Sequence, residues 1–544
     1  MDYRTRLLLT LSILPDFAGA IRQELDDLWV EHRPQFEEVV LGFLSAGPSP
    51  SAAFDLEQRL ANVVRELSRR VVERIFNRLE GDEATVLPSH VRHDGEDYRR
   101  LNDKTPNRHV GTLFGTITLW RHPYRCSRRD AGEPALFPLE MTLGLVQGAT
   151  PALAEAASRY LAEGGATQRT TLDRLKSHHG VCWGAERLRD LAAEMAQSMA
   201  EARHDFQVER VLDLLRQADA SRGAVKPVLS VGRDGTTLCD YQHRFFEHAA
   251  AGTVSVYDRA GKRLATVYLA FTPEPGQPTM SQHLTALIEE VLRRWEGPLP
   301  RLAYVTDAGE NETQYYRRVL RPMRHPRTGA KLHWQRVIDF YHAAQRLWTM
   351  AAALFGSDER AAAAWARRMC KLLKKPNGPF RVLHAAAQPR RKRTMPKWRQ
   401  KEYRQAYNYI RQRTRFMQYY EYAKKKIPLG SGVTEAACKT IYTQRLKLSG
   451  MRWKKPGAQV ILDLRVMLLS GVWLEAYRQI LDRRHNRELH SRPLRQRIDA
   501  KRRVNGTWER SHPTGLLRHR CSTFAAKFMT ASGTGKYPSP RGSP

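Results

Sequence analysis

The sequence predicts a multidomain α+β protein: a helical N-terminal region precedes an α/β core that a helical insertion interrupts. Three observations predict this class. The chain has 544 residues, more than one ordinary hydrophobic core holds. Apolar residues recur with the helical period in the first hundred residues and again at about 346–426, whereas residues 223–345 alternate strand and helix patterns. Hydrophobic residues make up 42% of the chain, which is enough to bury such cores.

The first predicted region, residues 1–108, is helical. Residues 57–79 place apolar side chains three and four positions apart on one helix face, namely Leu60, Val64, Leu67, Val71, Ile75 and Leu79. The apolar turn in RTRLLLTLSILPDF reads as a buried helix rather than a signal peptide, because the acidic stretch after it resembles mature protein. Residues 109–145 form a small β segment, in which Cys126, with His122 nearby, reads as a buried thiol rather than a metal site.

Residues 146–222 are predicted to be helical. A Gly-Gly break, a Thr-capped helix and a turn at Gly180 divide them into short helices. A DNA-binding helix-turn-helix and an ordinary helical hairpin fit this pattern equally well. In the first case Arg169, Arg174 and Lys176 would face phosphates.

The core begins at residue 223 and its first part runs to 345. Residues 226–238 form an apolar strand that ends at Asp234, and residues 252–271 form a hairpin. An amphipathic helix, 281–295, precedes a second apolar strand, 301–310, that ends in Asp307. Residues 331–348 run from a strand into a helix through Asp339 and His342. The order strand, hairpin, helix, strand, helix, strand, helix is that of an RNase H-like sheet.

A basic helical insertion, residues 346–427, follows. Within 389–426, fourteen Lys and Arg stand against two Glu, and eight aromatic residues lie among them. The charges suit phosphates, and the rings either stack on bases or form the core of this piece. The candidate DNA-binding residues here and after it are Arg390, Arg391, Lys392, Arg393, Lys397, Arg399, Arg411, Arg413, Arg415, Arg452 and Lys454. The core resumes at 428–478, and 479–544 is a basic, largely disordered tail.

The charge of the chain predicts its partner. Lys and Arg number 90 against 56 Asp and Glu, a formal net charge of +34, which favours nucleic acid as the partner, whereas the alternative, an anionic membrane, would need a basic amphipathic helix or a lipid signal that is not evident. No apolar run reaches the roughly 18–20 residues that span a bilayer, so no membrane partner is expected. The six cysteines form no CxxC pair, which argues against a disulfide framework and fits a reducing cytoplasm.

Three acids could hold metal for phosphodiester chemistry. Asp234 and Asp307 each end an apolar strand, and Glu435 falls in the first turn of a helix that Ser431 or Thr434 caps. Such chemistry needs two divalent cations with hard oxygen ligands. Alternatively, each Asp forms a turn and the Glu complements the helix dipole. Lys439 and Tyr442 are expected on the face of Glu435, and Asp339 with His342 near the site, as a helix cap and a partner that orients a carboxylate.

Four segments within roughly 225–475 resemble DDE insertion-sequence transposases of the ISKra group. They are VGRDGTTL, VTDAGENETQYY, VIDFYHAAQRLW and IPLGSGVTEAACKTIYTQRLKLSGMRWKKPGAQVILDLRVMLLSGVW. The resemblance implies an RNase H-like catalytic core with Asp234, Asp307 and Glu435 as the metal-binding triad. Two departures are visible: Asp307 is followed by Ala-Gly rather than Gly-Ala, and no second cysteine after Cys126 completes a metal knuckle.

The resemblance implies an enzyme that cleaves DNA at the ends of an insertion sequence and transfers the strand to a target. Its implied cofactors are two Mg²⁺ (or Mn²⁺) ions per active site. Its implied partners are the double-stranded DNA of the element ends and target and further copies of the chain in a synaptic complex, in the bacterial cytoplasm and associated with the nucleoid. The alternative is a catalytically inactive DNA-binding protein derived from a transposase. An RNA-processing nuclease on the same fold is the weaker third hypothesis.

Overall fold

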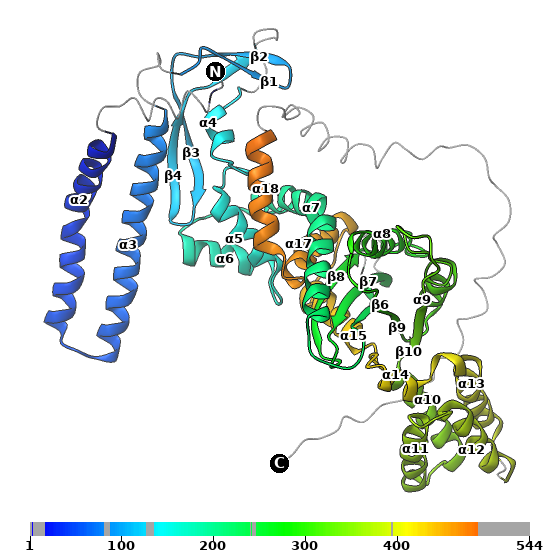
Figure 1. Ribbon diagram of the computed structural model, residues 1–544. Coiled ribbons are helices and arrows are strands. Elements are labelled where there is room, and N and C mark those ends of the chain that lie inside the picture. Colours follow the sequence, from blue (N-terminus) through cyan, green and yellow to red (C-terminus); the bar gives the residue numbers. More distant parts are fainter. Residues whose placement is uncertain are drawn as a thin grey trace, which may run out of the picture. The chain divides into compact units, whose positions relative to one another are not determined.

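The computed structural model describes residue 3 and residues 17–80, 87–126, 135–239, 241, 246–392 and 395–487 (Figure 1). These residues belong to one compact unit, Met1–Leu489, in which helices combine with three small sheets. The expected mixed α+β class is therefore confirmed. Of the expected disordered tail, 479–544, the part beyond residue 487 lies outside the described residues.

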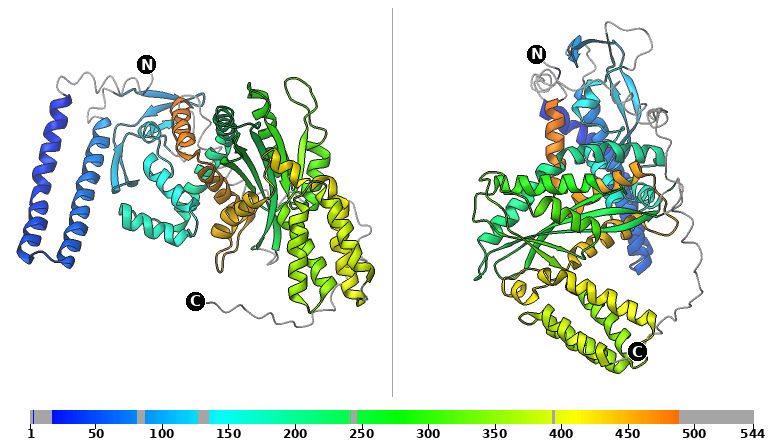
Figure 2. Two further views of the ribbon diagram at one scale, coloured as in Figure 1. Left: turned by 60° about the horizontal axis from the view of Figure 1, so that its bottom comes forward. Right: turned by 90° about the vertical axis from the view of Figure 1, so that its right-hand side faces the viewer.

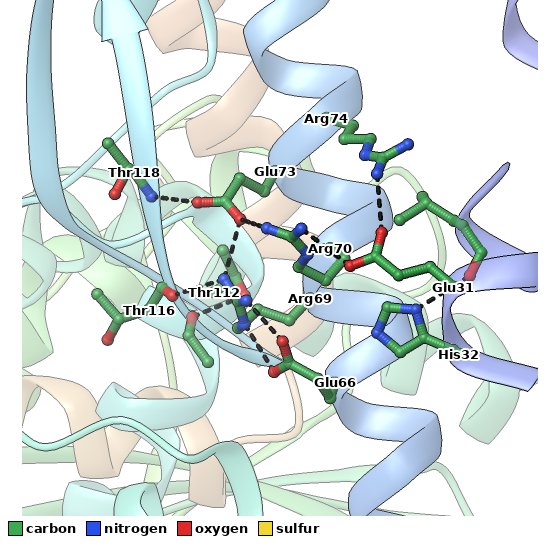
Figure 3. Close-up of polar contacts among 12 residues, drawn as sticks. Glu31, His32, Glu66, Arg69, Arg70, Glu73, Arg74, Thr112, Thr116 and Thr118 are labelled. Atoms are coloured by element: carbon green, nitrogen blue, oxygen red, sulfur yellow. Dashed lines mark hydrogen bonds and ion pairs between the residues drawn. The ribbon is translucent and has the colours of Figure 1, made fainter. Parts of the chain in front are cut away.

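Two long helices come first, α2 (Phe17–Ala46) and α3 (Pro50–Leu79). The helix predicted at 57–79 lies inside α3. This helix begins at Pro50 because the Ser49 hydroxyl accepts the amide N–H of Ala52, and a proline in the first turn needs no amide hydrogen bond. Ion pairs join α3 to α2, and Figure 3 shows those of Arg70 and Arg74 with Glu31.

Two small sheets follow α3. The strands β1 (His90–His93), β2 (Glu96–Arg100) and β5 (Tyr124–Cys126) form one sheet, and β3 (Thr105–Thr112) pairs with β4 (Gly115–Arg121). Residues 90–108 therefore contain strands instead of the expected helix. The turn between β1 and β2 falls at Asp94 and Gly95, whose φ angles are 50° and 83°. An Asp-Gly pair with two positive φ angles favours a tight hairpin, which explains the difference.

Helix α3 is fastened to the ribbon of β3 and β4. Glu73 accepts the amide N–H of Thr118 with an N···O distance of 2.8 Å, and Arg69 donates to the carbonyl of Thr116 at 3.3 Å (Figure 3). Val72 and Phe76 of α3 also pack against the apolar cluster under the ribbon. The C-terminal half of α3 is thus held by both polar and apolar contacts.

Four helices lead to the central sheet: α4 (Pro138–Thr142), α5 (Pro151–Ala162), α6 (Gln168–His179) and α7 (Ala185–Asp219). The predicted cap and turn are both present. The side chains and backbones of Thr167 and Thr170 form a reciprocal capping box at the start of α6. Gly180 ends α6 in the left-handed conformation, with φ at 65°.

The central sheet contains β6 (Val228–Cys239), β7 (Phe246–Tyr257), β8 (Arg263–Phe271), β9 (Arg301–Thr306) and β10 (Trp334–Ile338). Its strand order is β10-β9-β6-β7-β8. The strands β6, β7 and β8 are antiparallel neighbours, whereas β6, β9 and β10 run parallel. The predicted hairpin at 252–271 is present, and Asp258 closes it by accepting the amide N–H groups of Ala260 and Lys262.

Helices cover both faces of this sheet (Figure 2). On one face Leu229 and Val231 of β6 share a buried cluster with α7 and α8 (Pro278–Arg294). On the other face Val228 of β6 packs with α10 (Phe340–Phe355), while Ala249 and Ala251 of β7 pack with α15 (Gly432–Cys438) and α17 (Lys455–Leu469). Between β9 and β10 lie α9 (Glu310–Tyr315) and a π-helical turn, η1 (Tyr316–Leu320).

The predicted insertion is helical and continues from α10. It contains α11 (Glu359–Leu373), α12 (Gly378–Lys392), α13 (Lys397–Arg413), the 3₁₀ turn η2 (Thr414–Phe416) and α14 (Tyr419–Lys424). After α15 come a π-helical turn η3 (Lys439–Thr443), α16 (Gln444–Leu446), α17 and α18 (Trp473–Arg487).

No single helix in the described ranges is both long and apolar enough to cross a membrane. The pair α17 and α18 reaches that length and composition only together, across a bend of 114°. Ile461, Leu462 and Leu464 of α17 are buried in the protein's own core.

Candidate active site

Three aspartates lie in one row across the parallel strands. The parallel strands β6, β9 and β10 are all paired up to the level of Gly232, Val305 and Val337. Asp234, Asp307 and Asp339 each lie two positions after these residues. Asp307 and Asp339 directly follow the last residues of β9 and β10, and the Asp339 amide N–H donates to the Thr306 carbonyl at 2.9 Å. The structure therefore brings both predicted aspartates to one edge of the sheet, with Asp339 beside them.

Asp234 lies inside its strand, and the expectation that it ends the strand is wrong. The parallel pairing of β6 with β9 stops at Gly232, but the antiparallel pairing with β7 continues to Cys239. Asp307, by contrast, directly follows Thr306, the last residue of β9, as predicted. Asp234 is thus held on a paired strand, beside the point where its parallel neighbour leaves the sheet.

Asp339 is fully buried, 0% exposed, and its carboxylate joins the start of α10 to the loop before α15. Its Oδ1 atom caps α10 by accepting the amide N–H groups of Tyr341 and His342. Its Oδ2 atom accepts the amide N–H of Ser431 and lies 2.7 Å from the Ser431 hydroxyl. Because both carboxylate oxygens are used, Asp339 fixes the loop that precedes α15, in agreement with its predicted role as a cap near the site.

Helix α15 approaches β6 very closely. An added Cβ at Gly232 would lie 2.0 Å from Oγ1 of Thr434, far inside any real contact. The same Thr434 Oγ1 atom is 2.8 Å from Oγ1 of Thr253 in β7. Glu435 comes next in the chain, in the first turn of α15 as predicted, and Ser431 is the N-cap residue. The glycine in β6 therefore sets how closely the helix that carries Glu435 can approach the strand that carries Asp234.

Two side chains contact the Glu435 carboxylate. The Ser431 hydroxyl is 2.9 Å from Oε1, and Nε2 of His342 is 3.3 Å from the same oxygen. Since His342 lies in the first turn of α10, which Asp339 caps, both neighbours of Glu435 depend on Asp339. His342 was predicted to orient a carboxylate, and it lies beside that of Glu435.

Of the two residues expected on the face of Glu435, Lys439 is exposed, as Glu435 is, but Tyr442 turns away. Tyr442 is buried, and its hydroxyl donates to the carbonyls of Ala250 and Phe271 at 2.5 and 3.1 Å. The expectation that Tyr442 faces the site is therefore wrong. The cause is the π-helical turn η3, which holds an extra residue and rotates the following positions toward the core.

Burial and like charge perturb the acids of the site. Burial raises the pKa of Asp234, and the charges of Asp307 and Glu435 raise it further, while the Gly235 amide and the Cys438 thiol hydrogen-bond to it and act in the opposite direction. Asp307 and Glu435 are thus close enough to Asp234 to repel its charge. A cation at this edge of the sheet would relieve that repulsion.

Glu312 of α9 is a further acid at this edge. Burial raises its pKa, and the charges of Asp307 and Asp234 act in the same direction. Its side chain folds back over Gly309, where an added Cβ would lie 2.2 Å from Oε2. Glu312 therefore belongs to the same electrostatic environment as the three predicted acids.

Within the described ranges, the oxygen donors of the site do not surround a single metal position. Among the described residues, no group of three or more His, Cys, Asp and Glu side chains is placed so that it could hold a metal ion. The Oδ1 atoms of Asp234 and Asp307 accept nearby amide N–H groups at 2.7 and 2.9 Å. The donors are nevertheless of the hard oxygen type that Mg²⁺ and Mn²⁺ bind.

The predicted DNA-binding residues of the insertion differ in their surroundings. Lys397, Arg411 and Arg415 are exposed. Arg399 instead donates to the carbonyl of Ala353 at the C-terminal end of α10, at 3.0 Å, and Arg413 is half-buried. Beyond the insertion, Arg452 and Lys454 are exposed. The side chains of Arg390, Arg391 and Lys392, at the end of α12, and the whole of Arg393 lie outside the described residues.

Most aromatic residues of the insertion form its core. Tyr403, Tyr419 and Tyr422 are buried, whereas Trp398 is 63% exposed. Half-buried Tyr409 donates its hydroxyl to the carbonyl of Asp307 at 2.9 Å, which ties α13 to the edge of the sheet where the acids lie. The rings of the insertion therefore serve mainly to pack it and to attach it to the core.

The candidate helix-turn-helix consists of α5 and α6, joined by a five-residue connection. Arg169 and Lys176 are exposed and seven residues apart, so they share one face of α6. Arg174 is engaged, since its guanidinium donates to the Glu163 carboxylate at 2.6 Å. Two of the three predicted cations of α6 are thus open to a ligand.

Two buried arginines connect α5 to the segment that follows α15. Arg445 donates from Nε to the carbonyl of Leu161 at 2.7 Å. Arg465 donates to the carbonyl of Ala162 and, at 3.0 Å, to that of Thr440. Burial lowers the pKa of each guanidinium to about 10, and both remain charged near neutral pH. The C-terminal end of α5 is therefore fixed to the segment that follows α15.

Sequence reasoning missed three residues of this site. Glu312 follows Asp307 by five residues, and an acidic cluster in a basic chain was the available signal. Cys438 lies three residues after Glu435, a spacing that places both on one helix face. Arg346 of α10 lies with its Cζ atom 5.0 Å from the Tyr409 ring centroid, where Arg413 also stacks at 4.3 Å. Nothing in the pattern of the sequence singles out Arg346.

Comparison of the chain with protein-family models and with curated proteins gives no match.

Proposed function

We propose that this chain is a DDE transposase that cleaves DNA at the ends of an insertion sequence and transfers the strand to a target. One observation carries the proposal. Asp234, Asp307 and Glu435 come from three separate elements that meet at the carboxyl end of the parallel strands, where Thr434, next to Glu435, closely approaches Gly232, two residues before Asp234. These are the three acids that the resemblance to the ISKra group assigns to the metal-binding triad.

The central sheet supports an RNase H-like core. Its first three strands are antiparallel neighbours and its last two run parallel to the first, in the order β10-β9-β6-β7-β8. The acids lie on the first strand, after the fourth strand and on a helix that follows a helical insertion. This is the chain order that the resemblance implies for a DDE core.

On this proposal Asp234, Asp307 and Glu435 would hold two Mg²⁺ or Mn²⁺ ions. Such ions, when bound, activate the attacking oxygen and stabilise the leaving oxygen of a phosphodiester. Asp339 and Ser431 keep α15 in position, and His342 orients the Glu435 carboxylate. Exposed cations of α6 and α13 neutralise phosphates along the bound DNA.

The test is a cleavage assay with purified full-length protein, supercoiled DNA that carries the element ends, and Mg²⁺ or Mn²⁺. We expect nicking by the parent chain and none by Glu435→Gln or Asp307→Asn. The matched control is Glu310→Gln, because Glu310 is an exposed acid three residues after Asp307 and should leave nicking unchanged. Nicking by Glu435→Gln at the parent's rate would show that Glu435 does not serve the reaction.

A DNA-binding protein without catalysis is the second candidate. It is favoured by the finding that the acids in the described ranges form no group able to hold a metal as they stand. This candidate predicts salt-sensitive DNA binding that the three acid-to-amide changes leave intact, together with no nicking by the parent. The same set of proteins therefore separates the two candidates.

A further inference from the structure

Helix α2 is joined to α3 mainly through charged side chains. Three glutamates of α2, seven residues apart, face α3. Glu24 pairs with Arg78, Glu31 pairs with Arg70 and Arg74, and Glu38 pairs with Arg59. Except for Glu24, at 17%, these side chains are between 32% and 73% exposed, and exposed ion pairs contribute only about 0.2–1 kcal/mol each. Figure 3 shows the central set around Glu31. Ion pairs alone therefore hold two thirty-residue helices together weakly.

The two helices bury little apolar surface against each other. In α2 the side chains of Leu28, His32 and Val39 are buried, whereas none of the side chains of α3 is fully buried. Helices in proteins gain most of their stability from packing an apolar face. The pair of helices thus lacks a core of its own.

A second apolar stripe on α2 is open. Its members are Leu25, Trp29, Phe36, Val40 and Leu44, spaced four, seven, four and four residues apart. This spacing keeps them on one helix face, next to the face that Leu28 and Val39 turn to α3. Leu25, Trp29, Val40 and Leu44 are 42%, 49%, 45% and 66% exposed, and the rings of Trp29 and Phe36 are in contact, with centroids 5.3 Å apart.

The charge of α2 points to a protein as the occupant of this stripe. The helix carries six acidic and two basic residues, although the chain as a whole has a formal charge of +34. An acidic helix repels nucleic acid and anionic membranes. Two copies of so basic a chain repel each other over most of their surface, but α2 and α3 together carry ten acidic and eight basic residues, so two copies can approach there at little electrostatic cost.

The stripe is complementary to itself. Leu25 and Leu44 lie at equal distances from the point between residues 34 and 35, and so do Trp29 and Val40. A two-fold axis through that point would bring each leucine against the other and each Trp29 against the small Val40 of the second copy. Such an isologous contact closes on itself as a dimer.

The charges that flank the centre of the stripe agree with this pairing. Arg33 and Glu37 form an ion pair within α2, with an N···O distance of 2.7 Å, and lie within three positions of the same central point, where the pair can exchange partners with its copy. In the two-fold arrangement the Arg33 guanidinium of one copy comes beside the Glu37 carboxylate of the other. Opposite charges therefore meet on both sides of the axis.

We propose that the α2 stripe pairs with the same stripe of a second copy of this chain, antiparallel, to form a homodimer. The contact gives α2 the apolar partner that α3 does not supply. This inference does not depend on the proposed enzymatic function, because it uses only the charge, spacing and exposure of α2.

The first experiment measures the mass of the full-length protein by light scattering after gel filtration, in high salt to suppress contacts with residual DNA. We expect twice the chain mass of 62.5 kDa. Trp29→Glu with Val40→Glu should yield the mass of one chain, with helix content by circular dichroism unchanged. The matched control is Val30→Glu with Leu41→Glu, two equally apolar residues, 69% and 60% exposed, on a different face of α2. That control should stay dimeric.

A monomeric parent would overturn the proposal and would leave the stripe to residues 4–16 of the same chain or to another protein. An unchanged mass for the Trp29/Val40 variant, or dissociation of the Val30/Leu41 control, would also overturn it.

The second experiment tests the register. Trp29→Cys and Val40→Cys chains are mixed and oxidised, with the parent chain as the background for its native cysteines. Antiparallel pairing predicts a disulfide-linked dimer in the mixture, at several times the yield from Trp29→Cys alone. Equal or greater linkage in the Trp29→Cys sample alone would contradict the antiparallel arrangement.

Discussion

Replacement of Gly232 by alanine should displace the helix that carries Glu435. The added Cβ would lie 2.0 Å from Thr434 Oγ1, which is 1.4 Å short of the 3.4 Å at which ordinary contact begins. Rotation of the hydroxyl alone does not relieve the overlap, because Thr434 Cβ would be at 3.2 Å and Thr253 Oγ1 at 2.7 Å. Helix α15 must therefore move away from β6 by an appreciable part of that 1.4 Å.

Two magnitudes follow from this displacement. Overpacking a well-filled interior costs about 1–3 kcal/mol of the free energy of unfolding. A misplacement of about 1 Å at a reacting centre can cost about 10²-fold in rate. We therefore expect Gly232→Ala to reduce DNA nicking about 10²-fold and to lower the midpoint of thermal unfolding, both measured on purified protein.

Two further variants make this prediction sharp. In Gly232→Ala with Thr434→Ala the most severe overlap is gone, whereas the Thr253 hydroxyl would still lie 2.7 Å from the added Cβ, so only part of the nicking should return, and the double-mutant cycle should show coupling. Gly432→Ala is the control, because an added Cβ there meets nothing within 4 Å and Gly432 lies on the same helix. Parent-like nicking and stability in Gly232→Ala would refute the reasoning about α15.

Three further predictions concern the same region. Asp234→Asn should raise the unfolding temperature near pH 7: the folded-state pKa of Asp234 is raised, so its charge costs stability at high pH, and the gain should shrink as pH falls toward the ordinary Asp pKa. Mn²⁺ should stabilise the parent but not this variant. If the variant's gain in unfolding temperature grew as the pH fell, the raised pKa of Asp234 would be contradicted. Asp339→Ala should lower the free energy of unfolding by about 2–4 kcal/mol in denaturant titrations, because it removes a helix cap and leaves buried donors unpaired; a loss below 1 kcal/mol would show that Asp339 does not join α10 to the loop before α15. Arg411→Ala with Arg415→Ala should reduce the slope of log K for DNA against log salt by about 2, while Arg399→Ala, whose guanidinium binds α10, should lower stability and leave the slope unchanged.

Local patterns in the sequence predicted the order of strands and helices in the central sheet and the separate elements that carry the acids. The strand that precedes Asp307 and the helix that begins just before Glu435 both have short-range signals, an apolar run and a serine at the N-cap position. Such signals depend on neighbours in the chain, and they survive folding when tertiary contacts agree with them.

The predictions that failed depend on contacts between distant parts of the chain. Asp234 lies within its strand because β7 continues to pair with β6 after β9 has stopped. Tyr442 turns inward because a π-helical turn rotates it toward carbonyls on β7 and β8. Asp339 uses both oxygens because Ser431, 92 residues later, returns to it. No window of local sequence contains these partners.

The attachment of α5 to the segment after α15 has a consequence for where a cut would fall. Arg445 and Arg465 are buried between the two, and their hydrogen bonds to the last carbonyls of α5 leave no hinge there. If α6 binds the recognised DNA sequence and Glu435 serves the cleavage, the attachment of α5 keeps these two sites at a fixed separation. The number of base pairs between the recognised sequence and the broken bond would then be a property of this protein's interior, not of the DNA.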